Sequence, residues 1–316
     1  MSFVVHTVDL REFLEGSPSE RQSFSRQIGE SLKNTGFVKV SGHSITPQRL
    51  NHAYQDIKAF FVLPEVTKNQ YIVQGSGGAR GYTSFGQEHA KDNPIPDLKE
   101  FWHVGQENPP DGFDPSIYFR NLWPHETPRF KESLWSLYRD LEVCSQQLLE
   151  SLELYFDLPH RHLADMVVQG NSILRLIHYP ALKDRFIPGG VRASAHEDIN
   201  LITLLPAATE SGLELQDREG HWHAVDGLEG EIVVDAGDML SRHVNGIIPS
   251  TTHRVVNPKS PDDVRYSMPF FAHPRPEVIL DCPPSLLKEG ALKKYSPIRA
   301  NDFLIQRLIE IGLIKP

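Results

Sequence analysis

Short β-rich segments separated by turn residues fill the chain from residue 172 to about residue 272, and this pattern constrains the fold most. The segments are rich in Val, Ile, Leu and aromatic residues, and Gly, Pro, Asn and Asp lie between them, as in strands joined by tight turns. Regular strands of this kind indicate a sandwich or barrel, here a jelly roll. We expect strands at residues 173–179, 199–205, 212–216, 222–225, 231–235, 252–256 and 266–272.

Helical patterns flank the strands. Residues 17–36 begin with a serine cap, a proline at the first helical position and a glutamate three residues after the cap, and they end in glycine. Residues 46–61 and 128–156 carry apolar side chains at steps of three and four, and residues 303–311 repeat this stripe. The predicted class is therefore α+β with a mainly β core, a double-stranded β-helix (jelly-roll) barrel with supporting N-terminal, central and C-terminal helices.

The chain shows no internal repeat or low-complexity linker, and we interpret residues 1–316 as a single domain. Residues 1–160 form a mostly helical N-terminal support region, residues 170–275 the jelly-roll catalytic core, and residues 276–316 a C-terminal helical tail. Residues 237–246 are expected to form a turn between strands, because they contain an Asn-Gly pair.

The composition of the chain limits the classes of partner that we expect it to bind. The net charge of −9 argues against nucleic acid as the main partner, because phosphate binding needs a basic surface. No stretch approaches the roughly 20 apolar residues of a membrane span, and the N-terminus does not resemble a signal peptide. Two isolated cysteines indicate no disulfide framework, which fits a reducing cytoplasm. We therefore expect a cytoplasmic protein that binds a small molecule, and its oligomeric state stays open.

Two histidines and one carboxylate suggest a metal site. His196 and Asp198 precede the predicted strand 199–205, and His253 lies in a second predicted strand. Alternate residues of a strand share a face, so His196 and Asp198 should point the same way. Such a set holds mononuclear iron(II) and leaves other positions open. A helical HExxH zinc site is excluded because residue 200 is asparagine, and structural zinc is excluded because the cysteines form no close pair.

The chain resembles the iron(II)- and 2-oxoglutarate-dependent oxygenase superfamily, in the group that includes isopenicillin N synthase and plant oxygenases of flavonoid and hormone metabolism. The similarity rests on ILRLIHYPAL, AHEDINLITLL, GLELQDREGHWHAV, VVDAGDMLSRHVNG, STTHRVVNP and RYSMPFF. The resemblance implies an oxidoreductase, a dioxygenase that uses Fe(II), O2 and 2-oxoglutarate to hydroxylate or otherwise oxidise a small organic substrate and releases succinate and CO2.

The resemblance also implies site residues. His196, Asp198 and His253 match the iron ligands, and no catalytic residue is expected beyond them. Arg265, Ser267 and Tyr179 match residues that grip a carboxylate. The chemistry agrees, because a guanidinium holds a carboxylate through two parallel charge-assisted hydrogen bonds and the hydroxyl groups occupy the remaining lone pairs.

Two alternatives stay open at this point. Many plant members have asparagine where this chain has Ile177, and LIHYP is closer to the LIRYP of isopenicillin N synthase, which uses no 2-oxoglutarate. Arg265 and Ser267 therefore indicate a bound carboxylate without saying whose it is, and 2-oxoglutarate is favoured because most of the superfamily uses it. The second alternative is a non-catalytic jelly-roll protein that binds a metal or ligand.

Further residues are weaker candidates, and each has an ordinary structural interpretation beside the functional one. The glycine-rich segment 75–82 lacks a phosphate-binding motif and is interpreted as a loop beside a pocket. Four residues are proposed to contact the substrate: Arg80, Tyr82, His103 at the pocket mouth, and Phe271. Arg175 and Arg192 are either counter-charges for a substrate or salt-bridge partners, and His221 and His223 form an exposed hairpin pair.

Overall fold

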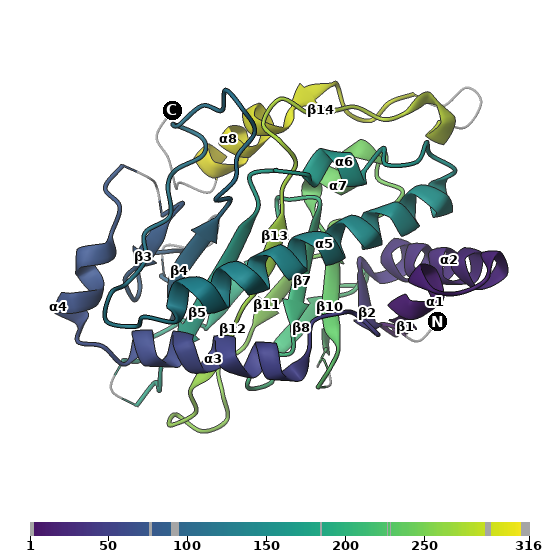
Figure 1. Cartoon of the computed structure of the whole chain (residues 1–316). Coiled ribbons are helices and arrows are strands. Elements are labelled where there is room, and N and C mark those ends of the chain that lie inside the picture. Colours follow the sequence, from purple (N-terminus) through teal and green to yellow (C-terminus); the bar gives the residue numbers. More distant parts are fainter. Residues whose placement is uncertain are drawn as a thin grey trace.

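Two β-sheets with apolar side chains packed between them form the centre of the protein (Figure 1). The computed structural model describes residues 3–75, 78–89, 95–183, 185–225, 227, 229–287 and 292–310. The larger sheet has the order β1-β2-β10-β7-β13-β5-β4-β3, and β12 also pairs with β5. Its strands are β1 (Thr7–Asp9), β2 (Phe37–Ser41), β3 (Gly81–Thr83), β4 (Glu100–Gly105), β5 (Ile173–Tyr179), β7 (Ile202–Pro206), β10 (Ile232–Ala236), β12 (Arg265–Ser267) and β13 (Phe270–Ala272).

The smaller sheet has four strands in the order β6-β11-β8-β9. They are β6 (Ala193–His196), β8 (Leu213–Gln216), β9 (Trp222–Ala224) and β11 (His253–Val255). Its apolar side chains meet those of the larger sheet in two clusters: Ala193 and Val255 lie against Ile177 and Tyr179, and the second cluster joins Phe37 and Val233 to Leu213, Leu215 and Val225. We call this space between the sheets the interior.

Helices cover the other face of the larger sheet. Along β5, Leu174 and Leu176 join the core under the helices, whereas Ile177 and Tyr179 face the interior, as strand alternation requires. The long helix α5 crosses that outer face with α3 beside it (Figure 1). The helices are α1 (Leu10–Leu14), α2 (Pro18–Thr35), α3 (Pro47–Phe61), α4 (Glu65–Lys68), α5 (Phe130–Phe156), α6 (Ala164–Val167), α7 (Asp238–His243) and α8 (Ala300–Glu310), with 3-10 turns η1 (Asn69–Tyr71) and η2 (Pro284–Leu286).

The helix signals read from the sequence are confirmed. Ser17 and Glu20 form the reciprocal capping box of α2, and Gly36 ends this helix with a φ of 75°. Thr46 caps α3 by accepting from the Arg49 amide. Helix α5 begins two residues after the predicted Pro128. The predicted C-terminal helix is α8, packed near the small sheet of β14 (Ile279–Leu280) and β15 (Ile298–Arg299); residue 311 of that prediction lies outside the described residues.

Two predicted strands and one predicted turn were wrong in detail. The segment 199–205 is a strand only from Ile202, because residues 197–201 form the connection from β6. The segment 266–272 is two strands, β12 and β13, and Pro269, which has no amide hydrogen to donate, lies between them. The expected turn at residues 237–246 contains helix α7, although the Asn-Gly turn is present, with φ of 57° at Asn245 and 74° at Gly246.

No helix among the described residues combines the length and apolar character that crossing a bilayer requires.

A close helix contact gives a stability prediction. An added Cβ atom at Gly29 in α2 would lie 2.3 Å from the Tyr155 ring of α5. We expect Gly29→Leu to destabilise the protein by about 1–3 kcal/mol, because overpacking at a buried contact forces the ring or the helix to move. Gln27→Leu, on the exposed side of the same helix, is the control. Chemical denaturation of both variants measures the effect, and equal stabilities would contradict this contact.

Candidate metal centre

The fold brings His196, Asp198 and His253 together. Strands β6 and β11 are antiparallel neighbours, and His253 pairs directly with His196. The ligand atoms of the three residues, called here the donor triad, lie within 4.8 Å of one another. Oδ1 of Asp198 is 3.8 Å from Nε2 of each imidazole. Two ligands about 2.0–2.2 Å from one small divalent ion are at most roughly 4.4 Å apart, so both separations fit a shared ion.

The two histidine rings are oriented by backbone carbonyls. Nδ1 of His196 lies 2.7 Å from the Ser194 carbonyl oxygen, and Nδ1 of His253 lies 3.2 Å from that of Thr251. Because a carbonyl only accepts, each Nδ1 donates a proton to it, and Nε2 is the nitrogen available to a metal. Burial, followed by repulsion from His196, lowers the pKa of His253 to about 4. The imidazole is therefore neutral near pH 7, the form that binds a metal.

The position of Asp198 differs from the prediction that it shares a strand face with His196. His196 ends β6 and Asp198 lies in the connection after it, so the two side chains converge through a turn and not along one strand face. The hydroxyl of Thr203 in β7 donates to Oδ2 of Asp198, and the Asn200 amide donates to that hydroxyl at 3.0 Å. This leaves Oδ1 facing the imidazoles. The sequence reasoning missed Thr203, whose only signal is one polar residue in an apolar run.

A second carboxyl group lies close to this network. Asp235 in β10 is buried, and burial followed by the charge of Asp198 raises the pKa of Asp235 well above its ordinary value. A raised pKa favours the protonated carboxyl, so Asp235 adds little negative charge beside the donor triad. Asp198 then supplies the carboxylate of the triad.

The Thr203 contact gives a testable expectation. Thr203→Val removes the hydrogen bond that orients Asp198, and loss of such an outer contact typically weakens metal binding about 10- to 100-fold. Titration of metal-free protein with a divalent transition metal measures the change. Thr203→Ser keeps the hydroxyl and should bind within a few-fold of the natural protein. Equal affinity of the valine variant would show that Thr203 does not orient the ligand.

Arg265, Ser267 and Tyr179 meet at another part of the interior and are called here the Arg265 site. Arg265 pairs with Tyr179 across β12 and β5, and all three side chains are buried. Nη1 of Arg265 lies 3.2 Å from the Ser267 hydroxyl, its Nε donates to the Glu210 carbonyl at 3.0 Å, and its guanidinium carbon is 5.0 Å from the centre of the Tyr179 ring. Arg265 and Ser267, alternate residues of β12, thus lie on one face of the strand.

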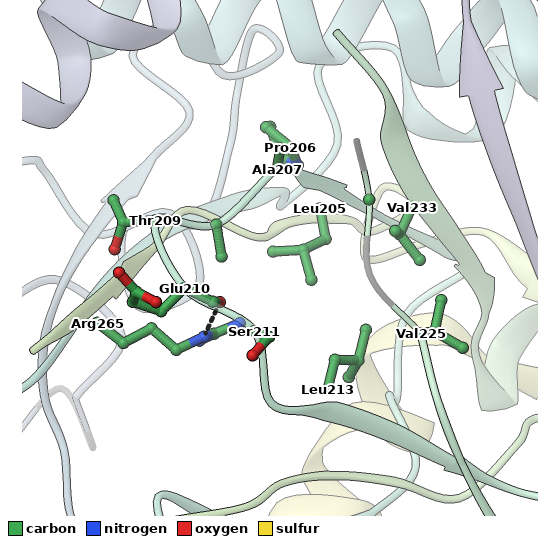
Figure 2. Close-up of a pocket in the computed structure, with 12 residues that line it drawn as sticks. Leu205, Pro206, Ala207, Thr209, Glu210, Ser211, Leu213, Val225, Val233 and Arg265 are labelled. Atoms are coloured by element: carbon green, nitrogen blue, oxygen red, sulfur yellow. Dashed lines mark hydrogen bonds between the residues drawn. The ribbon is translucent and has the colours of Figure 1, made fainter. Parts of the chain in front are cut away.

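A cavity of about 300 Å³ opens beside Arg265 (Figure 2). Leu205, Leu213 and Val233 line one side, and Arg265, Glu210 and Ser211 line the other. None of the donor triad lines this cavity. The donor triad and the cavity are nevertheless linked by β7, because Thr203 and Leu205 are alternate residues of one strand and Thr203 contacts Asp198.

His103 and Phe271 lie inside the fold around Arg175. Nε of Arg175 donates to Nε2 of His103 at 2.6 Å, and its guanidinium carbon is 5.3 Å from the Phe271 ring centre. Glu88 forms an ion pair with Arg175 at 3.0 Å, so the salt-bridge interpretation of Arg175 is confirmed. Phe271 also pairs with Thr203 across β13 and β7. His103 is buried, not at a pocket mouth.

Arg80 and Tyr82 are not brought to the donor triad. Arg80 is buried and donates to the carbonyl oxygens of Phe119 and Ala79. Tyr82 donates to Glu100, and its ring is 5.9 Å from the Phe60 ring in the core under the helices. Strand alternation explains this placement, because Tyr82 pairs with Trp102, which is also in that core. Residues 76–77 of the predicted loop lie outside the described residues.

In the β8–β9 hairpin His221 is exposed as expected, whereas His223 is half-buried and its ring stacks on Phe3. Asp217, Glu219 and His221 have ligand atoms within 4.8 Å of one another, but Glu219 and His221 are exposed. Asp217 already accepts from the Glu219 and His221 amides and lies 2.7 Å from His223. These bonds close a turn and account for the cluster without an ion.

Family models match two parts of the chain. Residues 5–126 match the model described as "non-haem dioxygenase in morphine synthesis N-terminal", and residues 170–274 match the "2OG-Fe(II) oxygenase superfamily". The second match contains the donor triad and the Arg265 site.

Known relatives extend the similarity over nearly the whole chain. The 2-oxoglutarate-Fe(II) type oxidoreductase ppzD of Metarhizium majus is 30% identical over 96% of this chain and 94% of its own length. The proline hydroxylase buaE of Petromyces alliaceus is 30% identical over 92% and 94%.

Solved structures share the fold. A 2OG-Fe(II) oxygenase family protein from Caulobacter crescentus has a TM-score of 0.86 and 37% identity, covering 97% of this chain and 99% of its own. Neurospora crassa T7H in complex with alpha-KG and thymine has a TM-score of 0.85 and 28% identity, covering 97% and 96%.

Proposed function

The chain belongs to the 2-oxoglutarate- and Fe(II)-dependent oxygenase superfamily, and from this premise we propose that the donor triad holds its iron and the Arg265 site its co-substrate. The enzyme is a 2-oxoglutarate-dependent dioxygenase that uses Fe(II), 2-oxoglutarate and O2 and acts on a small substrate. The relatives thereby favour 2-oxoglutarate over the co-substrate-free alternative. The observation that carries the residue assignment is the convergence of two imidazoles and one carboxylate on one point.

The donor set fits iron(II) chemically. Two imidazoles and one carboxylate are the ligand set of non-haem iron oxygenases, which leave positions open for other ligands. Iron bound there supplies the activation of O2 that a side chain cannot. His196 and His253 contribute imidazole nitrogens, and Asp198 contributes one carboxyl oxygen, with its second oxygen already satisfied by Thr203. The side chains thus hold and orient the metal and take no proton themselves.

The Arg265 site fits a carboxylate. Nε of Arg265 is occupied by the Glu210 carbonyl, and Nη1 contacts Ser267. The remaining N–H groups of the guanidinium have no partner among the described residues and can donate to an anion. We assign this anion as the 2-oxoglutarate carboxylate farthest from the keto group. The keto acid end then points along β7 toward the donor triad, since Thr203 and Leu205 join the cavity to Asp198.

The overall reaction balances as follows for a hydroxylation. One O2, one 2-oxoglutarate and one C–H bond give succinate, CO2 and a C–OH group, with one oxygen atom entering succinate and the other the substrate. Asp198, His253 and Arg265 are buried, whereas the side chain of His196 is 39% exposed. Burial around Asp198 and Arg265 limits the water that can compete with the substrate there.

We place the substrate beside Phe271. This residue pairs with Thr203 and contacts Arg175, so it lies between the donor triad and a buried polar cluster that can orient a substrate. A relative is named as a proline hydroxylase, and T7H was solved with thymine. Small ring compounds, pyrimidines and cyclic amino acids, are therefore the first substrates to test. Arg80 and Tyr82 are not included in this assignment.

The test is a product assay. Protein reconstituted with Fe(II) is incubated with 2-oxoglutarate, O2 and each ring compound, and succinate and oxidised product are quantified. A compound that raises succinate formation and itself gains one oxygen atom supports the substrate class. Removal of the metal by a chelator should abolish succinate formation, and added Fe(II) should restore it. Succinate that persists in chelator would contradict the metal assignment.

We further propose that residues 1–316 act as one unit with a jelly-roll core. The nine- and four-stranded sheets enclose the interior, and the N-terminal helices cover the larger sheet, so residues 1–160 support the catalytic core directly. The prediction of a cytoplasmic protein without nucleic-acid or membrane partners rests on composition alone, and the oligomeric state stays open.

A further inference from the structure

A second arginine lies next to the Arg265 site. Arg192 immediately precedes β6, and its side chain is 1% exposed. Nη2 donates to the Asp263 carbonyl at 2.7 Å, and Nε has no hydrogen-bond partner among the described residues. The guanidinium carbon is 5.8 Å from the centre of the Tyr179 ring, the same ring that Arg265 approaches. Two buried guanidinium groups therefore lie near the same tyrosine ring.

No described carboxylate forms an ion pair with either arginine. Two buried lysines are neutralised: Lys99 pairs with Glu88 and Asp97, and Lys68 pairs with Glu100. Arg80 also lacks an ion pair, but its Nε, Nη1 and Nη2 all donate to oxygen atoms. Arg192 has one such bond and an unsatisfied Nε. Burying a charge without an opposite charge is costly, and the cost is greater when two like charges are neighbours.

We propose that Arg192 is a second cation of the co-substrate site and that it binds, together with Arg265, the carboxylate of 2-oxoglutarate farthest from the keto group. This inference rests on the proposed function of the Arg265 site. An anion placed between the two guanidinium groups supplies the missing negative charge and accepts from the unsatisfied donors. Arg192 is thus a residue that selects a co-substrate with a second carboxylate.

A purely structural role predicts different behaviour. If Arg192 only ties the Asp263 backbone to the Tyr179 ring, its removal destabilises the metal-free protein and leaves ligand affinity unchanged. If it is a ligand-binding cation, its removal relieves repulsion in the empty protein and weakens 2-oxoglutarate binding. Burial and then repulsion from Arg265 lower the pKa of Arg192, and the Tyr179, Asp263 and Glu210 side chains oppose this shift without cancelling it. The structural role thus predicts a less stable protein with unchanged 2-oxoglutarate affinity, and the ligand-binding role predicts weaker affinity without a loss of stability.

The experiment compares Arg192→Met with Arg242→Met. Arg242 is a matched control, because it too has an unsatisfied Nε, one backbone-carbonyl bond to Ser296 and ring contacts to Tyr295 and Phe303, but no contact with the Arg265 site. Calorimetric titration of Mn(II)-loaded protein with 2-oxoglutarate gives Kd, and thermal unfolding of metal-free protein gives Tm. We expect Kd to rise about 10- to 100-fold in Arg192→Met, the loss for one charge-assisted hydrogen bond, with Tm unchanged or higher.

A second ligand isolates the far carboxylate. 2-Oxopentanoate has the keto acid and the chain length of 2-oxoglutarate without its second carboxylate, so Arg192→Met should bind it as the natural protein does. Arg192→Lys keeps a positive charge and should recover part of the 2-oxoglutarate affinity, which also covers the case in which the methionine variant does not fold.

The outcomes separate this inference from the proposed function. If Arg265→Met binds 2-oxoglutarate as tightly as the natural protein, or the natural protein binds none, the proposed co-substrate site is wrong and this inference fails with it. If Arg265→Met is weakened but Arg192→Met and Arg192→Lys bind normally, only this inference is overturned. A lower Tm with unchanged Kd in Arg192→Met would assign it the structural role.

Discussion

Replacing His196 by alanine is expected to reduce succinate formation by more than about a hundredfold. Loss of an outer contact to a metal ligand already costs roughly 10- to 100-fold, and loss of a ligand removes a bond to the metal itself. The side chain of His196 is 39% exposed, so its removal should leave the fold intact. The rate of succinate formation with Fe(II), 2-oxoglutarate and O2 measures the effect, and circular dichroism checks the fold.

His223→Ala is the matched control for this change. His223 lies in β9 of the same sheet, is partly exposed and pairs with Asp217, away from the donor triad. We expect it to keep the full rate. A His196→Ala variant that forms succinate at the natural rate, with bound iron, would remove His196 from the ligand set.

The second large effect is expected at Arg265. Arg265→Met removes two charge-assisted hydrogen bonds to the co-substrate, each worth about 1.5–3 kcal/mol. The sum corresponds to at least a hundredfold increase in the KM for 2-oxoglutarate. Because the residue acts on binding and not on the reacting atoms, kcat at saturating 2-oxoglutarate should fall much less. Steady-state kinetics with varied 2-oxoglutarate separate the two constants.

Arg275→Met is the control variant, because it removes an arginine that lies outside the proposed co-substrate site. Arg275 pairs with Glu277 and donates to the Val168 carbonyl, outside the interior. It should leave KM unchanged. A fall in kcat with an unchanged KM in Arg265→Met would contradict a co-substrate anchor and point to another role.

Local signals in the sequence predicted much of the fold. The capping box at Ser17 and Glu20 and the αL glycine at position 36 depend on neighbouring residues only, and they set both ends of α2 correctly. The alternating run 173–179 is strand β5 with the predicted bounds, because its pattern of buried residues matches two faces of a sheet. The ligand pattern also predicted which residues converge, since His196 and His253 lie on strands that pair.

Other features depend on contacts distant in sequence and left no local signal. Asp198 lies in a turn after β6 and accepts a hydrogen bond from Thr203. The alternation of side chains along a strand therefore predicted that Asp198 points toward His196, but a turn and not a strand places it there. The position of Tyr82 in the glycine-rich segment 75–82 predicts a substrate contact, but pairing of β3 with β4 directs this side chain to the core under the helices. The burial of Arg192 without an acid partner appears only when β5, β6 and the Asp263 backbone are assembled.

The central claim is that one donor triad holds iron(II) and Arg265 holds 2-oxoglutarate beside it. The most direct test adds iron(II) to metal-free protein without oxygen, then 2-oxoglutarate, and follows the weak visible charge-transfer band of a keto acid chelated to iron. We predict a band that saturates in the natural protein, that needs about a hundredfold more 2-oxoglutarate in Arg265→Met, and that is absent in His196→Ala. No band in the natural protein, with iron shown to be bound, would contradict the account.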